Sequence, residues 1–98
     1  MNACKLIERS FMVDGHKAIF RAQLVGGKLA GTTFEWDSPP KRISNRFKQD
    51  YRKKRDLMME LIVKEINEPF MMIDDFDSRP VITAYYPDKA TTREYYPN

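Results

Sequence analysis

The dipeptide Asp14-Gly15 constrains this chain more than any other feature of its sequence. Residues 3–13 and 16–25, on either side of it, alternate apolar and polar side chains as half-buried β-strands do. A two-residue type I′ turn requires positive φ at both central positions, and Asp-Gly is among the sequences that adopt it most readily. The sequence therefore predicts a β-hairpin with its turn at this dipeptide.

The short loop also sets the register of the predicted hairpin. Residues that face each other share one side of the sheet, because side chains alternate along a strand. The predicted pairs are Val13 with His16, Phe11 with Ala18, Ile7 with Ala22, Glu8 with Arg21, and Arg9 with Phe20. Apolar pairs then gather on one side and an ion pair lies on the other. Arg9 does not fit this pattern, so we expect it at a sheet edge or at a bulge.

Residues 28–36 form a third predicted strand, which follows a turn at two glycines. Their alternation changes phase: Leu29 belongs on the apolar side of the sheet, whereas Phe34 and Trp36 have the opposite parity. One extra residue near Gly31 would bring these three side chains to the same side, and glycine readily occupies a β-bulge. The sequence thus predicts a three-stranded antiparallel meander with a bulge near Gly31.

A long helix is predicted after the meander. Two starts are open: Ser38 as the N-cap with Pro39 at the first helical position, or Ser44 as the N-cap. Asn67 and then Pro69 mark the end of the helix. Counted from Ser44 to Asn67, the residues make a rod of about 36 Å.

Helical spacing divides the apolar residues of this stretch into two lines. The first line, expected to lie across the meander, comprises Phe47, Tyr51, Met58, Leu61 and Ile62, extended by Ile43. The second line, on the flank of the first, comprises Met59, Val63 and Ile66. This second line requires a cover, which residues 70–73, residues 81–86 or a second subunit would supply.

These elements predict an α+β fold. It consists of a three-stranded antiparallel β-meander packed against one long α-helix, with a short C-terminal extension that can add a strand. A chain of 98 residues has the size of one domain, and we expect a single domain over residues 1–87. Residues 88–98 are mostly polar and are expected to form a flexible tail.

Charge is distributed unevenly along the predicted helix. Residues 41–55 contain eight Lys and Arg against the single acid Asp50, whereas residues 56–77 contain seven Asp and Glu against Lys64 alone. Bases near the start of a helix and acids near its end both oppose the helix dipole, at a cost of about 0.3–1 kcal/mol per group. Local stability disfavours this arrangement, which indicates that the charges serve a contact.

We expect the basic residues of the first half to bind an anionic partner, either nucleic acid or an acidic protein surface. The candidate residues are Lys41, Arg42, Arg46, Lys48, Arg52, Lys53 and Arg55. Lys54 falls within the apolar stripe, so its stem is expected to cover apolar surface. Nucleic acid is slightly favoured, because an ordinary solvated helix face mixes charges of both signs. The hairpin residues Lys17, Arg21 and Lys28 would extend the surface if they lie beside the helix.

Other interpretations of the charges remain open. The basic run can be a solvated helix face, or the acids Asp74, Asp75 and Asp77 can fold back onto Arg52 or Arg55. In an antiparallel homodimer, the basic half of one helix would face the acidic half of its mate. The alternative function is then a protein-binding regulator or inhibitor of phage or mobile-element type, acting through protein–protein contacts or as a homodimer.

Signals for catalysis and for bound cofactors are missing from the sequence. It has no phosphate-binding glycine loop, no Cys/His ligand set and no nucleophile elbow. The acids at 74–77 lack the spacing and the glycine of a calcium loop, so no metal is expected. The single cysteine cannot form an internal disulfide, and no apolar run exceeds four residues. We expect a cytoplasmic, non-enzymatic binding protein without a cofactor, a small-molecule substrate or a membrane contact.

Overall fold

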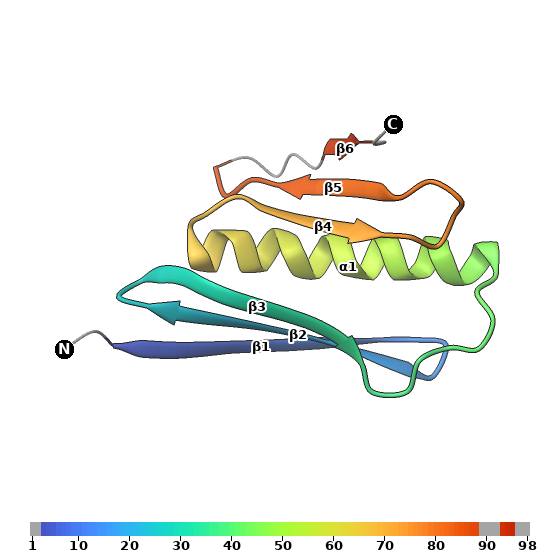
Figure 1. The fold of residues 1–98 in the computed structure, drawn as a ribbon, viewed down its shortest axis with the longest axis horizontal. Coiled ribbons are helices and arrows are strands. Elements are labelled where there is room, and N and C mark those ends of the chain that lie inside the picture. Colours follow the sequence, from blue (N-terminus) through green and yellow to red (C-terminus); the bar gives the residue numbers. More distant parts are fainter. Residues whose placement is uncertain (1–2, 89–92, 96–98) are drawn as a thin grey trace. The chain divides into compact units, whose positions relative to one another are not determined.

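The computed structural model describes residues 3–88 and 93–95 and has the predicted α+β fold (Figure 1). The elements in chain order are β1 (Cys4–Val13), β2 (His16–Val25), β3 (Lys28–Trp36), α1 (Asn45–Ile66), β4 (Phe70–Asp74), β5 (Val81–Tyr85) and β6 (Arg93–Tyr95). The chain divides into two compact units, Met1–Arg55 (unit 1) and Asp56–Asn98 (unit 2). Within the described ranges, no helix has both the length and the apolar character needed to cross a membrane.

β1, β2 and β3 form an antiparallel sheet in that order, as predicted. At the first turn, Asp14 and Gly15 have φ angles of 49° and 79°, the positive values that a type I′ turn requires. The register of β1 and β2 runs without a break from this turn to Cys4, which lies opposite Val25, and it contains every predicted pair. The prediction of the hairpin is therefore confirmed.

Arg9, which does not fit the apolar pattern, lies opposite Phe20 in an edge strand of the sheet. No register shift interrupts the pairing of β1 with β2, so there is no bulge at Arg9. Of the two predicted explanations, the edge position is the one that the structure has. Its Nη1 donates a hydrogen bond of 2.8 Å to the carbonyl oxygen of Glu8. Edge strands leave backbone groups without a strand partner, and here an exposed guanidinium covers one of them.

A bulge in β3 brings its aromatic residues to the inner side of the sheet. The register shifts between Gln23, which pairs with Gly31, and the next residue of β2, which pairs with Leu29. One residue of β3 is therefore left over, at the place the sequence predicted. Beyond the shift, Phe34 and Trp36 lie opposite buried residues of β2.

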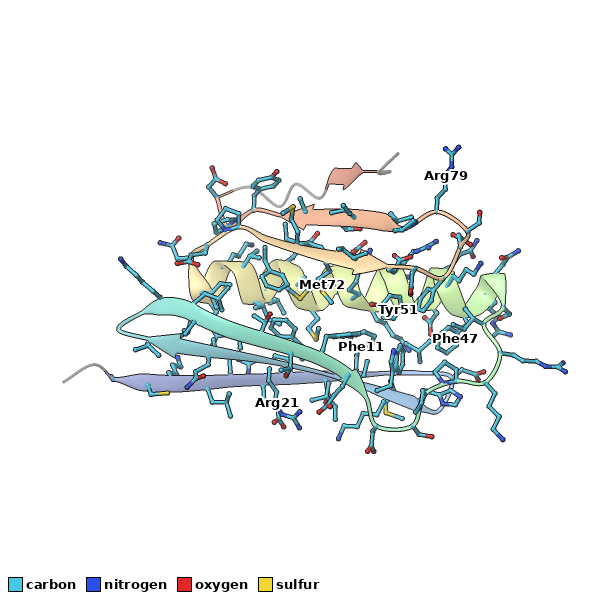
Figure 2. The ribbon with its side chains drawn as sticks, in the orientation of Figure 1. Phe11, Arg21, Phe47, Tyr51, Met72 and Arg79 are labelled. Carbon is cyan, nitrogen blue, oxygen red and sulfur yellow. The ribbon has the colours of Figure 1, made fainter. Side chains whose placement is uncertain are left out.

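Aromatic rings join the meander to the part of α1 that belongs to unit 1. The ring centroid of Tyr51 lies 5.8 Å from that of Phe11 and 5.7 Å from that of Trp36. Phe47, one helical turn earlier, lies 5.8 Å from Trp36. Figure 2 shows Phe47 and Tyr51 extending from α1 on the side where Phe11 lies. These contacts determine which face of α1 is buried in unit 1.

α1 begins directly after Ser44, its N-cap. The Ser44 Oγ accepts a hydrogen bond of 3.1 Å from the backbone N–H of Phe47, which satisfies one of the free donors of the first turn. Of the two predicted starts, the structure has Ser44 and not Ser38. At the other end, Asn67 has a φ of 56°, and its N–H donates to the carbonyl oxygen of Val63 at 2.8 Å.

Unit 2 has its own sheet and its own core. β4, β5 and β6 form an antiparallel sheet in that order. The buried apolar residues of this unit are Met59, Ile62, Val63 and Ile66 of α1, and Met72, Val81, Ala84 and Tyr85 of the sheet. The Tyr85 hydroxyl donates a hydrogen bond of 2.6 Å to Asp56 Oδ1 of α1. The second apolar line of the helix is thus part of the core, and residues 70–73 and 81–85 form strands of the same unit.

The predicted apolar stripe of the helix is wrong at two positions. Leu61 is 69% exposed and Ile43 is 38% exposed, although their spacing places both in the core. In unit 2 the buried face of α1 includes Met59 and Val63 instead. Ile43 precedes α1, which begins at Asn45, so helical spacing does not apply to it; in the second half the buried positions move around the helix axis to Met59, Val63 and Ile66, which leaves Leu61 outside.

Part of the predicted tail at residues 88–98 forms a strand. β6 pairs with β5, with Arg93 opposite Ala84 and Tyr95 opposite Ile82. The remainder of that tail prediction, at 89–92 and 96–98, lies outside the described residues.

Candidate nucleic-acid interface

The segment between β3 and α1 carries the first two candidate residues, Lys41 and Arg42. The backbone N–H of Asp37 donates to a carbonyl oxygen of β2 at 2.9 Å. The Nδ1 of His16 lies 2.7 Å from the carbonyl oxygen of Ser38, and because a carbonyl oxygen only accepts, the imidazole donates. The start of the segment is therefore anchored to the hairpin, and both basic side chains are exposed.

Four of the seven candidate side chains are exposed, and two are half-buried and make contacts within the protein. Lys41, Arg42, Arg46 and Lys53 are exposed, and Lys48 and Arg52 are half-buried. We call these six residues the basic surface. All of them belong to unit 1, and those from Arg46 onward lie on α1. The structure thus places the six side chains on one continuous stretch of chain.

Arg55 does not belong to an exposed surface, contrary to the expectation from the sequence. Its side chain is 1% exposed, and its guanidinium carbon lies 5.5 Å from the centroid of the Tyr51 ring. A cation is attracted to the electron-rich face of an aromatic ring. Arg55 follows the buried Tyr51 by one helical turn and therefore falls on the same face of α1. It contributes to the core of unit 1 and is removed from the candidate site.

The single acid within the basic run is paired inside the protein. Asp50 Oδ2 lies 3.1 Å from the Nζ of Lys54, one turn further along α1. The same Nζ donates to the carbonyl oxygen of Met12 in β1 at 2.6 Å. Lys54 thus contacts both the sheet and Asp50, and this ion pair, whose side chains are 41% and 42% exposed, partly offsets the negative charge of Asp50.

The sign of the net charge changes at the boundary between the two units. Unit 1 has 13 Lys and Arg against 5 Asp and Glu, a formal net charge of +8. Unit 2 has 4 Lys and Arg against 9 Asp and Glu, a formal net charge of −5. The inversion that the sequence shows after Arg55 therefore coincides with a structural division of the chain.

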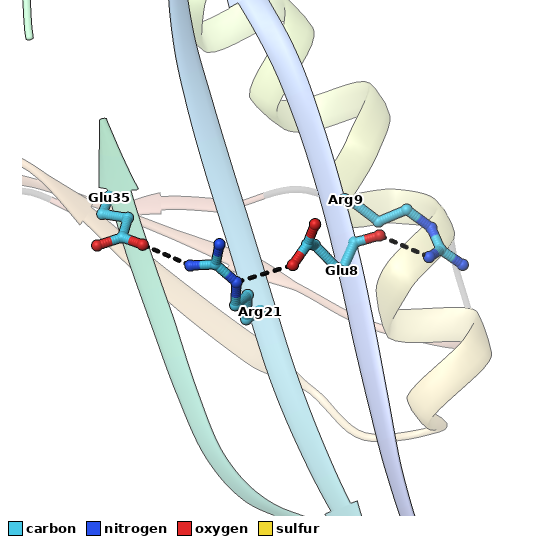
Figure 3. Close-up of polar contacts among 4 residues, drawn as sticks. All are labelled: Glu8, Arg9, Arg21 and Glu35. Atoms are coloured by element: carbon cyan, nitrogen blue, oxygen red, sulfur yellow. Dashed lines mark hydrogen bonds and ion pairs between the residues drawn. The ribbon is translucent and has the colours of Figure 1, made fainter. Parts of the chain in front are cut away.

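Arg21 does not extend the basic surface, because two acids on neighbouring strands bind it (Figure 3). Its Nε donates to Glu8 Oε2 at 2.8 Å, and its Nη1 donates to Glu35 of β3. The bond to Glu8 and then the bond to Glu35 raise the pKa of the guanidinium above its ordinary value. Arg21 and Lys17 also alternate with the buried residues of β2, so they lie on the side of the sheet away from α1.

Around the axis of α1, the four cations of the basic surface that lie on the helix fall on two flanks. Phe47 is taken as zero, and each residue advances by about 100°. Lys48 and Arg52 then lie near about 100° and 140°. Arg46 and Lys53 lie near about 260° and 240°. A ridge of α1 separates these two flanks.

Two neutral amides occupy the ridge between the flanks. Asn45 lies near about 160° and Gln49 near about 200°, and both side chains are exposed. Neither amide is among the residues that the sequence predicted for the site, because only charged groups were expected to bind. The helical angles that place the cations also place these two amides, so their positions on α1 could have been predicted from the sequence.

The acids at the end of β4 and directly after it differ in their exposure. Asp74 is buried in unit 2, whereas Asp75 and Asp77 are exposed. The expectation that they fold back onto Arg52 or Arg55 stays a prediction. Within the part of the chain that the structure describes, no three His, Cys, Asp or Glu side chains are grouped to hold a metal ion.

Comparison with known proteins gives no guide to function, so the functional proposal is based on the geometry of unit 1. No protein-family model, no curated protein and no solved structure matches this chain.

Proposed function

We propose that this protein binds nucleic acid through the phosphate backbone, using the basic surface. The observation that carries the proposal is the density of cations from Lys41 to Lys53, of which Lys41, Arg42, Arg46 and Lys53 are exposed, with Asp50 as the single acid, ion-paired with Lys54. The protein acts by binding and not by catalysis in this proposal, and its location is the cytoplasm.

The physical basis is the release of counterions. A Lys or Arg that neutralises a phosphate displaces an ion condensed on the nucleic acid, which makes the affinity depend on salt. If four residues of the basic surface neutralise phosphates, log affinity falls with log salt at a slope of about −3.6. Between 50 and 200 mM salt the affinity should then drop roughly a hundredfold.

Fluorescence anisotropy of a labelled DNA duplex, titrated at several salt concentrations, tests the proposal. The variant Arg46→Ala/Lys53→Ala removes two exposed cations and should make the salt slope shallower by about 1.8. A matched control, Lys64→Ala/Arg79→Ala, removes the same charges from exposed positions in unit 2. Arg79 lies in the loop between β4 and β5 (Figure 2). The control should keep the slope of the wild type.

Two outcomes would contradict the proposal. One is the absence of binding at 50 mM salt, or binding that salt does not change. The other is an equal loss of affinity in both variants, because binding would then follow the net charge of the protein and not the basic surface.

A protein-binding regulator is the second candidate, and unit 2 carries the observation that favours it. Met71 and Ile73 of β4 are each 65% exposed and lie on one side of the sheet, where Ile73 is opposite the half-buried Ile82 of β5. Exposed apolar side chains that adjoin one another are typical of protein interaction surfaces. The net negative charge of unit 2 favours a partner with a basic surface.

A further inference from the structure

β4 is an edge strand of the sheet of unit 2. The order of that sheet is β4-β5-β6, so β5 pairs with one side of β4 (Figure 1). Among the described residues, no strand pairs with the other side of β4. An edge strand presents a row of backbone N–H and C=O groups to which another extended chain can hydrogen-bond. This side of β4, which we call the outer edge, therefore has the backbone geometry to add a strand.

The side chains on the exposed face of β4 are apolar. Met71 and Ile73 are each 65% exposed, whereas Met72 between them is buried. Alternate residues of a strand lie on the same face of a sheet. A strand added at the outer edge would therefore place every second side chain beside Met71 and Ile73. Cross-strand apolar pairs stabilise a sheet, so this face favours a strand with apolar residues at alternate positions.

The edges of the sheet in unit 1 differ from β4 in their charge. β1 carries Glu8 and Arg9, and the Arg9 guanidinium donates to the carbonyl oxygen of Glu8. β3 carries Lys28 and Glu35. Charged side chains are a common means by which proteins protect edge strands from pairing with another chain. Residues 70–73 of β4 contain no charge, so this edge lacks the protection that β1 and β3 have.

The charge around β4 favours a basic partner. Asp75 follows β4 directly and is exposed. Unit 2 as a whole has a formal net charge of −5. Complementary charge speeds the encounter of two partners and fixes their register. The five residues of β4 span about 17 Å, so a segment of about five residues with Lys or Arg at its end would bring a cation to Asp75.

We infer that the outer edge of β4 binds an extended, basic segment of a partner protein, which adds to the sheet as a strand and places apolar side chains beside Met71 and Ile73. This inference rests on the second candidate function, the protein-binding regulator, and specifies the chemistry of the partner. Phosphate binding by unit 1 does not depend on it, so each of the two can fail alone.

Hydrogen exchange of the full-length protein, resolved by NMR, tests the inference with a designed peptide. The probe is Lys-Thr-Val-Thr-Val-Thr-Lys, blocked at both ends, whose palindromic sequence presents the same side chains in either direction. Added peptide should slow the exchange of backbone amides in β4 and leave those of β1 and β3 unchanged. The same peptide with Glu in place of both Lys should bind more weakly, because Asp75 and the net charge of unit 2 repel it.

Methylation of the peptide backbone distinguishes strand addition from other contacts. The N–H groups of alternate residues point to opposite sides of a strand, and only one side would face β4. Two forms of the peptide, one N-methylated at both valines and one at two of the threonines, should therefore differ. One form should lose affinity by about 5-fold or more, because two hydrogen bonds are removed, and the other should bind like the parent peptide.

A variant of β4 tests the role of its apolar face. Met71→Thr/Ile73→Thr keeps residues that suit a strand and should weaken peptide binding by about 2-fold to 30-fold, the range that two cross-strand pairs provide. Leu6→Thr/Met12→Thr is the matched control, because it removes two exposed apolar side chains from β1, an edge strand of unit 1. The control should bind the peptide like the wild type.

Four results would overturn the inference. They are unchanged exchange in β4 of the wild type, equal affinity for the two methylated peptides, tighter binding of the peptide with Glu, and equal binding by the β4 variant and the wild type. Protection of β4 that rises with protein concentration in the absence of peptide would identify a second copy as the occupant and would also overturn it. The β4 variant should keep the DNA affinity of the wild type, so these results are separate from a failure of phosphate binding. The wild-type measurements decide the matter even if the variant does not fold.

Discussion

Arg55 shows how packing can decide the role of a single residue. A guanidinium that is buried against Tyr51 gains attraction from the ring and apolar contact along its stem. The neighbouring Lys53, two positions earlier on the same helix, is exposed. Two cations from one basic run thus have different environments, one in the core of unit 1 and the other at its surface.

Replacement of Arg55 by alanine should destabilise the protein by roughly 2–5 kcal/mol, because it leaves a cavity where a large side chain was buried. Lys53→Ala is the matched control and should change stability by less than about 0.5 kcal/mol. Urea denaturation of both variants measures the difference. A change of less than about 0.5 kcal/mol in Arg55→Ala would show that the guanidinium does not contribute to the core.

At the scale of secondary-structure elements, one turn and one cap organise unit 1. The positive φ of Asp14 and Gly15 closes the first hairpin, and the hydrogen bond to Ser44 Oγ starts α1. Each of these features acts over two or three residues. For this reason the sequence predicts both features. It does not decide between Ser38 and Ser44, because both residues have the chemistry of an N-cap.

Two glycines of unit 1 provide a matched test of backbone conformation. Gly15 has a φ of 79°, whereas Gly31 has no positive φ, and a Cβ at either position would meet no atom within 4 Å. Gly15→Ala should therefore destabilise the protein by about 1–2 kcal/mol through backbone strain alone. Gly31→Ala should lie within about 0.5 kcal/mol of the wild type. Chemical denaturation compares them, and equal effects would contradict this account.

At the scale of the whole molecule, the chain combines a unit of charge +8 with a unit of charge −5. Because one chain carries both signs of charge, the basic unit of one copy can attract the acidic unit of another copy. The same units can also attract an external partner of opposite charge. The antiparallel homodimer, one of the interpretations that the sequence leaves open, is such an arrangement. Salt screens both kinds of attraction, so low-salt measurements are the ones that reveal them.

We predict weak self-association that depends on salt. In sedimentation velocity at 50 mM salt, the sedimentation coefficient should rise with protein concentration, and the rise should disappear in about 1 M salt, where the Debye length is about 3 Å. The variant Lys64→Ala/Arg79→Ala should self-associate at least as strongly as the wild type, because it leaves the basic surface intact and makes unit 2 more negative. A coefficient that stays constant at every protein concentration would exclude the homodimer.

The local elements of this protein were determined by its sequence: the hairpin and its register, the bulge near Gly31, the end of α1 at Asn67 and the inversion of charge after Arg55. Each depends on residues that are close in sequence or that alternate regularly, so short-range sterics and periodicity are sufficient. Only the tertiary structure decided three other features: the burial of Arg55, the exposure of Leu61 and the ion pair between Arg21 and Glu35. They depend on which sheet each part of α1 packs against and on which strands become neighbours, and these contacts join residues far apart in the chain.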